Sequence, residues 1–152
     1  MTAKIFTSLL VLLLSQTMWA QTAFPKVINI SNNSKVIEEL SSVYKHSLFL
    51  ASENDFVKTM ENWKRALTDM EQYANEIDFD LKGVQMWMKI YWAKDGNIDH
   101  ITYYLLDKSI NIDTKELEAF LSSYIKNKKL PIKYEHKFSY DSRVVFPLYL
   151  MR

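Results

Sequence analysis

Apolar residues recur at helical spacing in three segments of this chain. The first segment starts at Ser34 and carries Val36, Ile37, Leu40, Val43 and Tyr44. The second carries Phe56, Met60, Trp63, Leu67, Met70 and Ala74, and the third carries Leu117, Phe120, Leu121, Tyr124 and Ile125. Gaps of three and four residues place such side chains on one face of an α-helix. We therefore predict a short helix from Ser34, a long core helix over 56–74 and a third helix over 117–125.

Polar residues with capping chemistry precede two of these segments. In "SEND", residues 52–55, the Ser52 oxygen is predicted to accept a free backbone N–H while Asp55 reaches back. Asp113 and Glu116 form a similar pair before the third segment, and Pro131 is expected to stop the helix that follows. These signals support helix starts near Ser52 and Asp113.

Residues 84–93 alternate between two apolar faces. One face carries Val84, Met86, Met88, Ile90 and Trp92, and the other carries Trp87, Tyr91 and Ala93. A strand that is apolar on both faces is usually central and covered on both sides. We expect the 117–125 helix to cover one face and the 56–74 helix to cover the other. Residues 98–106 alternate in the same way and predict the next strand.

Asp95 and Gly96 lie between these two strands and predict a β-hairpin, because both residues tolerate the positive backbone angles of a tight turn. With a two-residue loop, Ile90 faces Ile101 and Met88 faces Tyr103. With a three-residue loop, Trp92 faces Ile98, and a bulge near Asp99 must return Ile101 to the inner face. The sequence leaves both registers open.

Asp99 and His100 raise the question of a catalytic pair beside the turn. Neighbouring residues of a regular strand point to opposite faces, so these two side chains are not expected to form a proton relay. We therefore interpret residues 89–106 as a hairpin rather than a catalytic corner. Replacing Asp99 or His100 with alanine is expected to leave binding nearly intact.

The order of hairpin, acid-capped helix, proline loop and final strand resembles that of the TonB C-terminal domain family. The matching segments are "GVQMWMKIYWAKDGNI" at 83–98, "IDTKELEAFLSSY" at 112–124, "LP" at 130–131 and "VVFPLYL" at 144–150. The resemblance implies an α+β fold in which N-terminal helices precede a ββαβ antiparallel sheet packed with helices. It covers about residues 83–150, and we carry over the fold and the mode of binding but not energy transduction.

The domain organisation follows from these assignments. Residues 1–20 are assigned to a signal peptide, 21–33 to a leader segment, 34–82 to a helical N-terminal part and 83–152 to the TonB-like part of the same single domain. The signal peptide is predicted from one positive charge at Lys4, an apolar run from Ile5 to Leu14 and the small residue Ala20 at the boundary. Cleavage near Ala20 would place the protein in the periplasm or outside the cell, with no stable membrane anchor.

The closing segment, Arg143 to Leu150, is predicted to be a strand at or near an edge of the sheet. Pro147 supports this position because proline lacks the N–H that a strand between two neighbours must donate. We expect backbone groups of Val144, Val145 and Phe146 to pair with an extended segment of a partner protein, a second copy of this chain included. Arg143 and Tyr149 are expected to contact the side chains of that partner.

Charge and composition narrow the remaining classes of function. The chain has 19 basic and 18 acidic side chains, so it lacks the basic surplus that is typical of nucleic-acid binders. It has no cysteine, which excludes disulfides and cysteine-linked lipid anchors. His46, His100 and His136 have no second ligand at metal spacing, and no nucleophile elbow, phosphate loop or nucleotide motif is present. We therefore expect no catalytic, cofactor-binding or metal-binding residues.

One alternative to a non-enzymatic interaction domain stays open. Four aromatic residues could line the cleft of a small secreted ligand-binding domain or enzyme, namely Trp63, Trp87, Tyr91 and Tyr104. A concave pocket with converging polar groups would favour this alternative.

Overall fold

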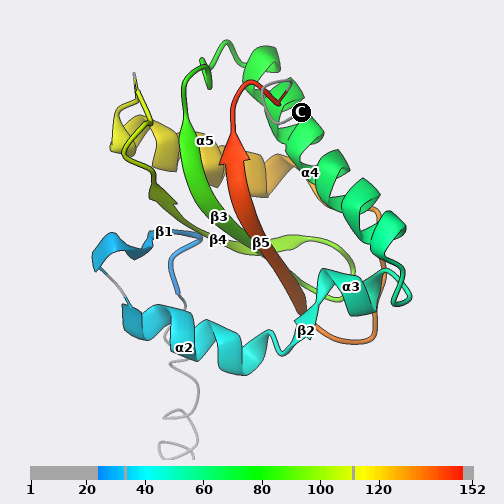
Figure 1. Cartoon of the computed structure of the whole chain (residues 1–152). Helices are drawn as coiled ribbons and strands as arrows, with labels where there is room; N and C mark the ends of the chain where they lie inside the picture. Colours follow the sequence, from blue (N-terminus) through cyan, green and yellow to red (C-terminus); the bar gives the residue numbers. More distant parts are fainter. Residues whose placement is uncertain (1–23, 33, 111, 149–152) are drawn as a thin grey trace, which may run out of the picture.

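The computed structural model describes residues 24–32, 34–110 and 112–148. These residues form a mixed α+β fold in which one five-stranded sheet is packed with four α-helices, so the predicted α+β class is confirmed (Figure 1). In chain order the elements are β1 (Val27–Asn29), the 3-10 helix η1 (Ile30–Asn32), α2 (Ser34–Val43), β2 (His46–Ser47), α3 (Leu48–Ala51), α4 (Phe56–Glu76), β3 (Gln85–Trp92), β4 (Ile98–Leu105), α5 (Thr114–Asn127) and β5 (Phe138–Val145).

The sheet has the strand order β1-β4-β3-β5-β2. The central strand β3 pairs in antiparallel fashion with β4 on one side and β5 on the other, which confirms its predicted central position. The short strands β1 and β2 are parallel additions to β4 and β5. Both come from the segment before α4, where the sequence predicted a leader and helices but no strand.

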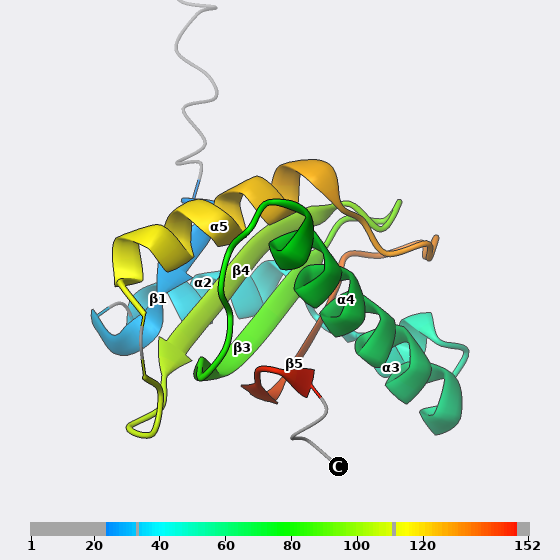
Figure 2. The ribbon, with the colours of Figure 1, turned by 90° about the horizontal axis from the view of Figure 1, so that it is seen from above.

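Helices α4 and α5 cover the same face of the sheet. Alternate residues of β3 on this core face, Met86, Met88, Ile90 and Trp92, are fully buried in one cluster with both helices. The two helices also touch, since the Tyr124 hydroxyl donates to the Ala66 carbonyl over 2.9 Å. Figure 2 shows α5 running along β4 and α4 lying beside β3 and β5. The expectation that they cover opposite faces is therefore wrong.

The opposite face of the sheet, which we call the α2 face, carries Trp87, Lys89 and Tyr91 of β3. Tyr91 is fully buried here by Leu40, which lies within α2, and by Tyr44, which follows the helix. Trp87, four residues earlier on the same face, is 39% exposed. The short helix α2 thus provides the second cover that the apolar pattern required, but it covers only one end of the strand.

The hairpin adopts the three-residue register with a bulge. Trp92 pairs with Ile98 and Ile90 pairs with Ile101, which leaves Asp99 as the extra residue of β4. Gly96 has a φ of 84°, and Asp95 accepts the Asn97 N–H through Oδ1 over 3.1 Å. The interpretation of Asp95 and Gly96 as turn residues agrees with this geometry.

The predicted capping residue is confirmed for α5 and is wrong for α4. Asp113 caps α5 as predicted, because its side chain accepts the N–H groups of Lys115 and Glu116. Helix α4 is instead capped by Asp55, whose side chain accepts the Lys58 N–H. Ser52 is buried and accepts the Asn62 side-chain amide. It is the C-cap of α3, so the predicted capping role of Ser52 is wrong.

The last strand begins earlier than the sequence suggested. It spans Phe138–Val145, whereas the closing strand was predicted over 143–150. Pro147 therefore lies after β5, at a cis peptide bond with Phe146, and is not evidence about pairing within the strand. Tyr149 and Leu150 lie outside the described residues.

Candidate functional site

The outer edge of β5 is only partly paired. Strand β2 contacts it at two positions, with His46 opposite Phe138 and Ser47 opposite Ser139. Beyond Ser139, no strand among the described residues pairs with this side of β5. The stretch from Tyr140 to Val145 therefore offers an open edge.

The direction of the backbone groups along this edge follows from the pairing with β3. The Phe146 N–H donates to the Val84 carbonyl over 2.9 Å. Because residues of an antiparallel strand alternate between bonding to one neighbour and facing the other way, Val144 and Ser142 also bond toward β3. The outward-facing N–H and C=O groups then belong to Asp141, Arg143 and Val145.

The predicted binding residues divide into two sets in this geometry. Arg143 is exposed and Val145 is half-buried, and both direct backbone groups outward. Val144 and Phe146 are fully buried, and their side chains belong to the core cluster. Tyr149 lies outside the described residues. The structure thus places Arg143 and Val145 at the open edge and turns Val144 and Phe146 away from it.

Polar contacts connect the edge to the uncovered part of the α2 face. Arg143 lies opposite Trp87, and its Nη2 donates to the Gln85 Oε1 over 3.1 Å. Asp141 accepts the Trp87 indole N–H through Oδ2 over 3.1 Å, and its Oδ1 lies 3.8 Å from the Lys89 ammonium. The alternation of β5 could have identified Asp141, which was missed because the predicted strand began at Arg143, five residues after the observed start at Phe138.

The charges at this edge are unequally compensated. Asp141 has both a donor and a cation beside it, whereas the described side-chain partner of Arg143 is a neutral amide. No ion pair of Arg143 with a carboxylate is found among residues 24–32, 34–110 and 112–148. The edge therefore presents a guanidinium that keeps donors for an incoming group.

The four aromatic residues of the alternative cleft do not come together. Trp63 lies on the core face, where it is nearly buried and donates its indole N–H to the Ser142 hydroxyl over 2.9 Å. Trp87, Tyr91 and Tyr104 lie on the α2 face, with Tyr104 opposite Trp87. The sheet separates Trp63 from the other three, so these four residues do not line one common cleft.

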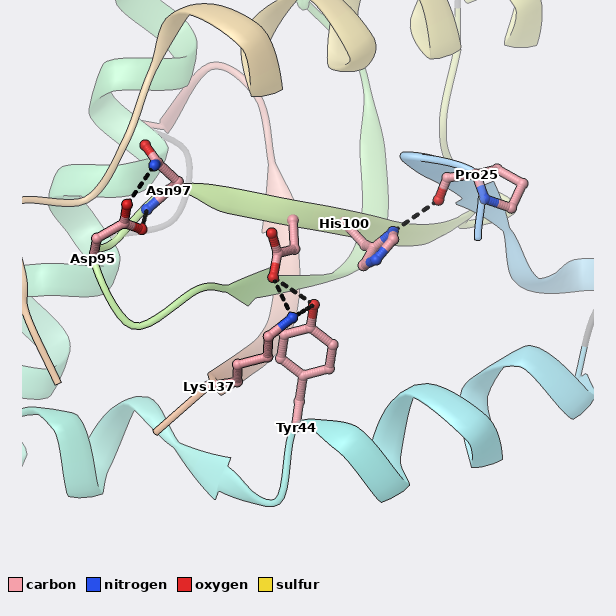
Figure 3. A network of polar contacts seen from close by, with 7 residues as sticks. Pro25, Tyr44, Asp95, Asn97, His100 and Lys137 are labelled. Carbon is pink, nitrogen blue, oxygen red and sulfur yellow. Dashed lines mark hydrogen bonds and ion pairs between the residues drawn. The ribbon is translucent and has the colours of Figure 1, made fainter. Parts of the chain in front are cut away.

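A polar cluster surrounds Asp99 at the hairpin bulge, next to the residue that follows α2. Figure 3 shows Tyr44, Lys137 and His100 of this cluster. The Tyr44 hydroxyl donates to Asp99 Oδ2 over 2.7 Å, and the Lys137 ammonium donates to the same oxygen over 3.0 Å. His100 Nδ1 lies 2.9 Å from the Pro25 carbonyl, and its ring is edge-on to that of Tyr44. The bulge brings Asp99 and His100 to the same side, so the argument that they must point apart is wrong. Each nevertheless has its own partner.

The electrostatics of this cluster favour an anchor between α2 and the sheet. Burial alone would raise the pKa of the Asp99 carboxyl, but hydrogen bonds from Tyr44 and Lys137, with the charge of Lys137, outweigh it and the pKa is lowered. Burial and the bond to Asp99 raise the pKa of the Tyr44 hydroxyl. Burial also lowers the pKa of His100, although its bond to the Pro25 carbonyl opposes this. A neutral phenol therefore donates to a carboxylate that stays ionised.

We expect Asp99→Asn to lower the free energy of unfolding by about 1 kcal/mol at neutral pH, a modest value because the cluster is partly exposed. A lowered folded-state pKa contributes stability above the unfolded-state pKa of the carboxyl, and this contribution is lost as the pH falls through the folded-state pKa. Urea unfolding between neutral and acid pH measures the difference. It should shrink in acid, and a difference that grows in acid would contradict this role of Asp99.

Glu38→Gln provides the control for that experiment. Glu38 is exposed on α2, so the same loss of one carboxylate should change stability by less than about 0.5 kcal/mol.

Two other features of the described residues lie outside the open edge. A cavity of about 520 Å³ lies between the end of α4, the loop before β3 and the end of β5, with Glu71, Phe79, Asp80 and Pro147 in its lining. At the base of the sheet, the rings of His46 and His136 stack at 4.1 Å. No cluster of metal-ligating side chains is found in the part of the chain that the structure describes.

Comparisons with known proteins do not identify a relative. No protein-family model matches this chain, and no match was found among curated proteins or solved structures. In the described ranges, no helix has both the length and the apolar character needed to cross a membrane.

Proposed function

We propose that this protein is an exported, non-enzymatic interaction domain that binds an extended segment of a partner protein along the outer edge of β5. The resemblance of residues 83–150 to TonB C-terminal domains supports this function, since strand addition is the binding style that it implies. A signal peptide cleaved near Ala20 would deliver the domain to the periplasm or the extracellular space.

The observation that carries the proposal is the open edge at Asp141, Arg143 and Val145. Unpaired backbone groups on an exposed strand are a template for another strand, and proteins usually protect such edges with charge, proline or a cover. Here β2 covers only Phe138 and Ser139. An incoming strand would gain backbone hydrogen bonds from the open stretch, and its alternate side chains would meet the α2 face beside Trp87.

The Val145→Pro variant tests this proposal. Proline at Val145 removes an N–H that faces outward, so the ladder to β3 stays intact while strand addition loses a donor. We expect the folded variant to lose at least about 1 kcal/mol of partner affinity, roughly a fivefold weakening. Affinity capture from native envelope and culture fluid, followed by titration of the captured partner, measures the effect.

The control is Val144→Pro, one residue earlier. Val144 bonds toward β3 and is fully buried, so this proline should unfold the domain rather than affect binding alone. Circular dichroism separates the two outcomes. If Val145→Pro folds and retains the affinity of the wild type, the outer edge of β5 is not the binding site.

A further inference from the structure

The open edge of β5 is short enough to restrict its partners. Three residues direct backbone groups outward, Asp141, Arg143 and Val145, and β2 blocks the edge at Ser139. At the other end, Pro147 has no N–H to offer. An incoming strand is therefore confined to the positions opposite this stretch.

The β5 strands of two copies of the chain do not fit together as a twofold antiparallel pair. Twofold pairing that uses all three outward residues must be centred on Arg143, which sets the two guanidinium groups directly opposite each other. Asp141 would then face Val145, so neither charge finds an opposite charge in its direct partner. Like charges directly opposite on a sheet are destabilising.

The neighbouring self-pairing registers fail for different reasons. Centring on Ser142 does pair Asp141 with Arg143, but it places Val145 of one copy opposite Ser139 of the other. That position is already occupied by Ser47 of β2. A shift in the other direction places Asp141 opposite Pro147 and removes one outward residue from the ladder. Charge and steric exclusion thus disfavour each complete twofold pairing.

The side chains at the edge of β5 indicate which residues an incoming strand should carry. Asp141 is compensated by the Trp87 N–H and the Lys89 ammonium, whereas Arg143 has only the Gln85 amide as a described side-chain partner. A carboxylate opposite Arg143 could accept two parallel N–H bonds from its guanidinium. The apolar Val145 and the exposed Trp87 ring favour an uncharged residue two positions away on the same face of the incoming strand.

We propose, on the basis of the proposed function, that the edge of β5 selects a segment of a different protein that carries an acidic residue opposite Arg143. The Arg143 guanidinium binds the carboxylate of that residue. The outward backbone groups of Asp141, Arg143 and Val145 form hydrogen bonds with the backbone of the incoming strand. Complete twofold self-pairing is disfavoured by the same arginine, by β2 and by Pro147.

Blocked synthetic peptides test this inference without an identified partner. The first has seven residues, with a central glutamate and with threonine and valine alternating on either side, and the second has glutamine at the centre. Amide shifts of Asp141, Arg143 and Val145 in NMR titrations report the binding of each peptide. We expect the glutamate peptide to bind about fivefold more tightly, and this preference to fall with added salt.

Two variants locate the source of the preference. Arg143→Gln should bind both peptides equally, because the charge that distinguishes them is gone. Arg65→Gln makes the same substitution at an exposed position of α4, outside the edge residues, and should retain the preference. Sedimentation of the wild type should show a monomer. A dimer that Val145→Pro disrupts would overturn the exclusion of self-pairing.

The outcomes distinguish this inference from the proposed function on which it rests. If both peptides bind the edge equally and Val145→Pro weakens both, the edge binds strands but does not select an acidic residue. If neither peptide shifts these amides, or if Val145→Pro binds both as the wild type does, the edge proposal fails as well.

Discussion

The Gly96→Val variant is expected to lose roughly 3 kcal/mol or more of folding free energy. Two effects combine at this position. Gly96 has a φ of 84°, which a β-branched residue rarely adopts. A Cβ here would lie 1.9 Å from the Leu130 carbonyl oxygen and 2.7 Å from that of Ile132, and neither backbone oxygen can move without displacing the segment after α5. Chemical denaturation measures the loss.

Gly83→Val is the matched control for Gly96→Val. Its φ of 87° is nearly the same, but an added Cβ would meet the side chain of Ile110, which is 58% exposed and can rotate away. We expect a loss of about 1 kcal/mol, from backbone strain alone. Equal losses in the two variants would show that the Leu130 carbonyl contributes nothing.

Trp92→Ala is expected to cost about 4 kcal/mol, within the range for large aromatic residues removed from a core. Trp92 is fully buried, stacks on Phe138 with ring centroids 5.3 Å apart and meets Trp63 edge-on at 6.3 Å. Alanine would leave a cavity between β3, β5 and α4. Thermal or denaturant unfolding measures the change.

The same substitution on the other face provides the comparison. Trp87 is 39% exposed on the α2 face, so Trp87→Ala should cost only about 0.5 kcal/mol. If both variants lost similar amounts, Trp87 would be covered in the folded protein, and the open face beside β5 would not exist.

Local signals in the sequence predicted much of the sheet. The alternation of 84–93 predicted a central strand, and the acid cap at Asp113 predicted the start of α5. The Asp95-Gly96 pair predicted the hairpin but left its register open, because both loops bury the same inner residues of β4. Asp99 at the bulge makes tertiary contacts with Tyr44 and Lys137, which sequence spacing does not reveal.

Other features could not be predicted because they depend on long-range pairing. Strand β2 has only two residues, His46 and Ser47, too few to show a periodic pattern. The face that each helix covers depends on its connections, since an amphipathic stripe on α4 suits either face of an apolar strand. Of the residues at the open edge, the sequence-based prediction included Arg143 and Val145, but it placed the strand too late to include Asp141.

The arrangement of β1 and β2 has a consequence for the order of folding. Strands β3 and β4, α5 and β5 follow one another within residues 85–145, so the long ladders of β3 with β4 and β5 lie within this unit. The segment 27–47 instead reaches both sides of the finished sheet, with Val27 beside Ile101 and His46 beside Phe138. These pairings close long loops and involve few residues, so the entropy lost is large for each bond gained. The N-terminal segment is therefore expected to dock last and to detach first, in a local opening that uncovers Tyr91 and lengthens the free edge of β5.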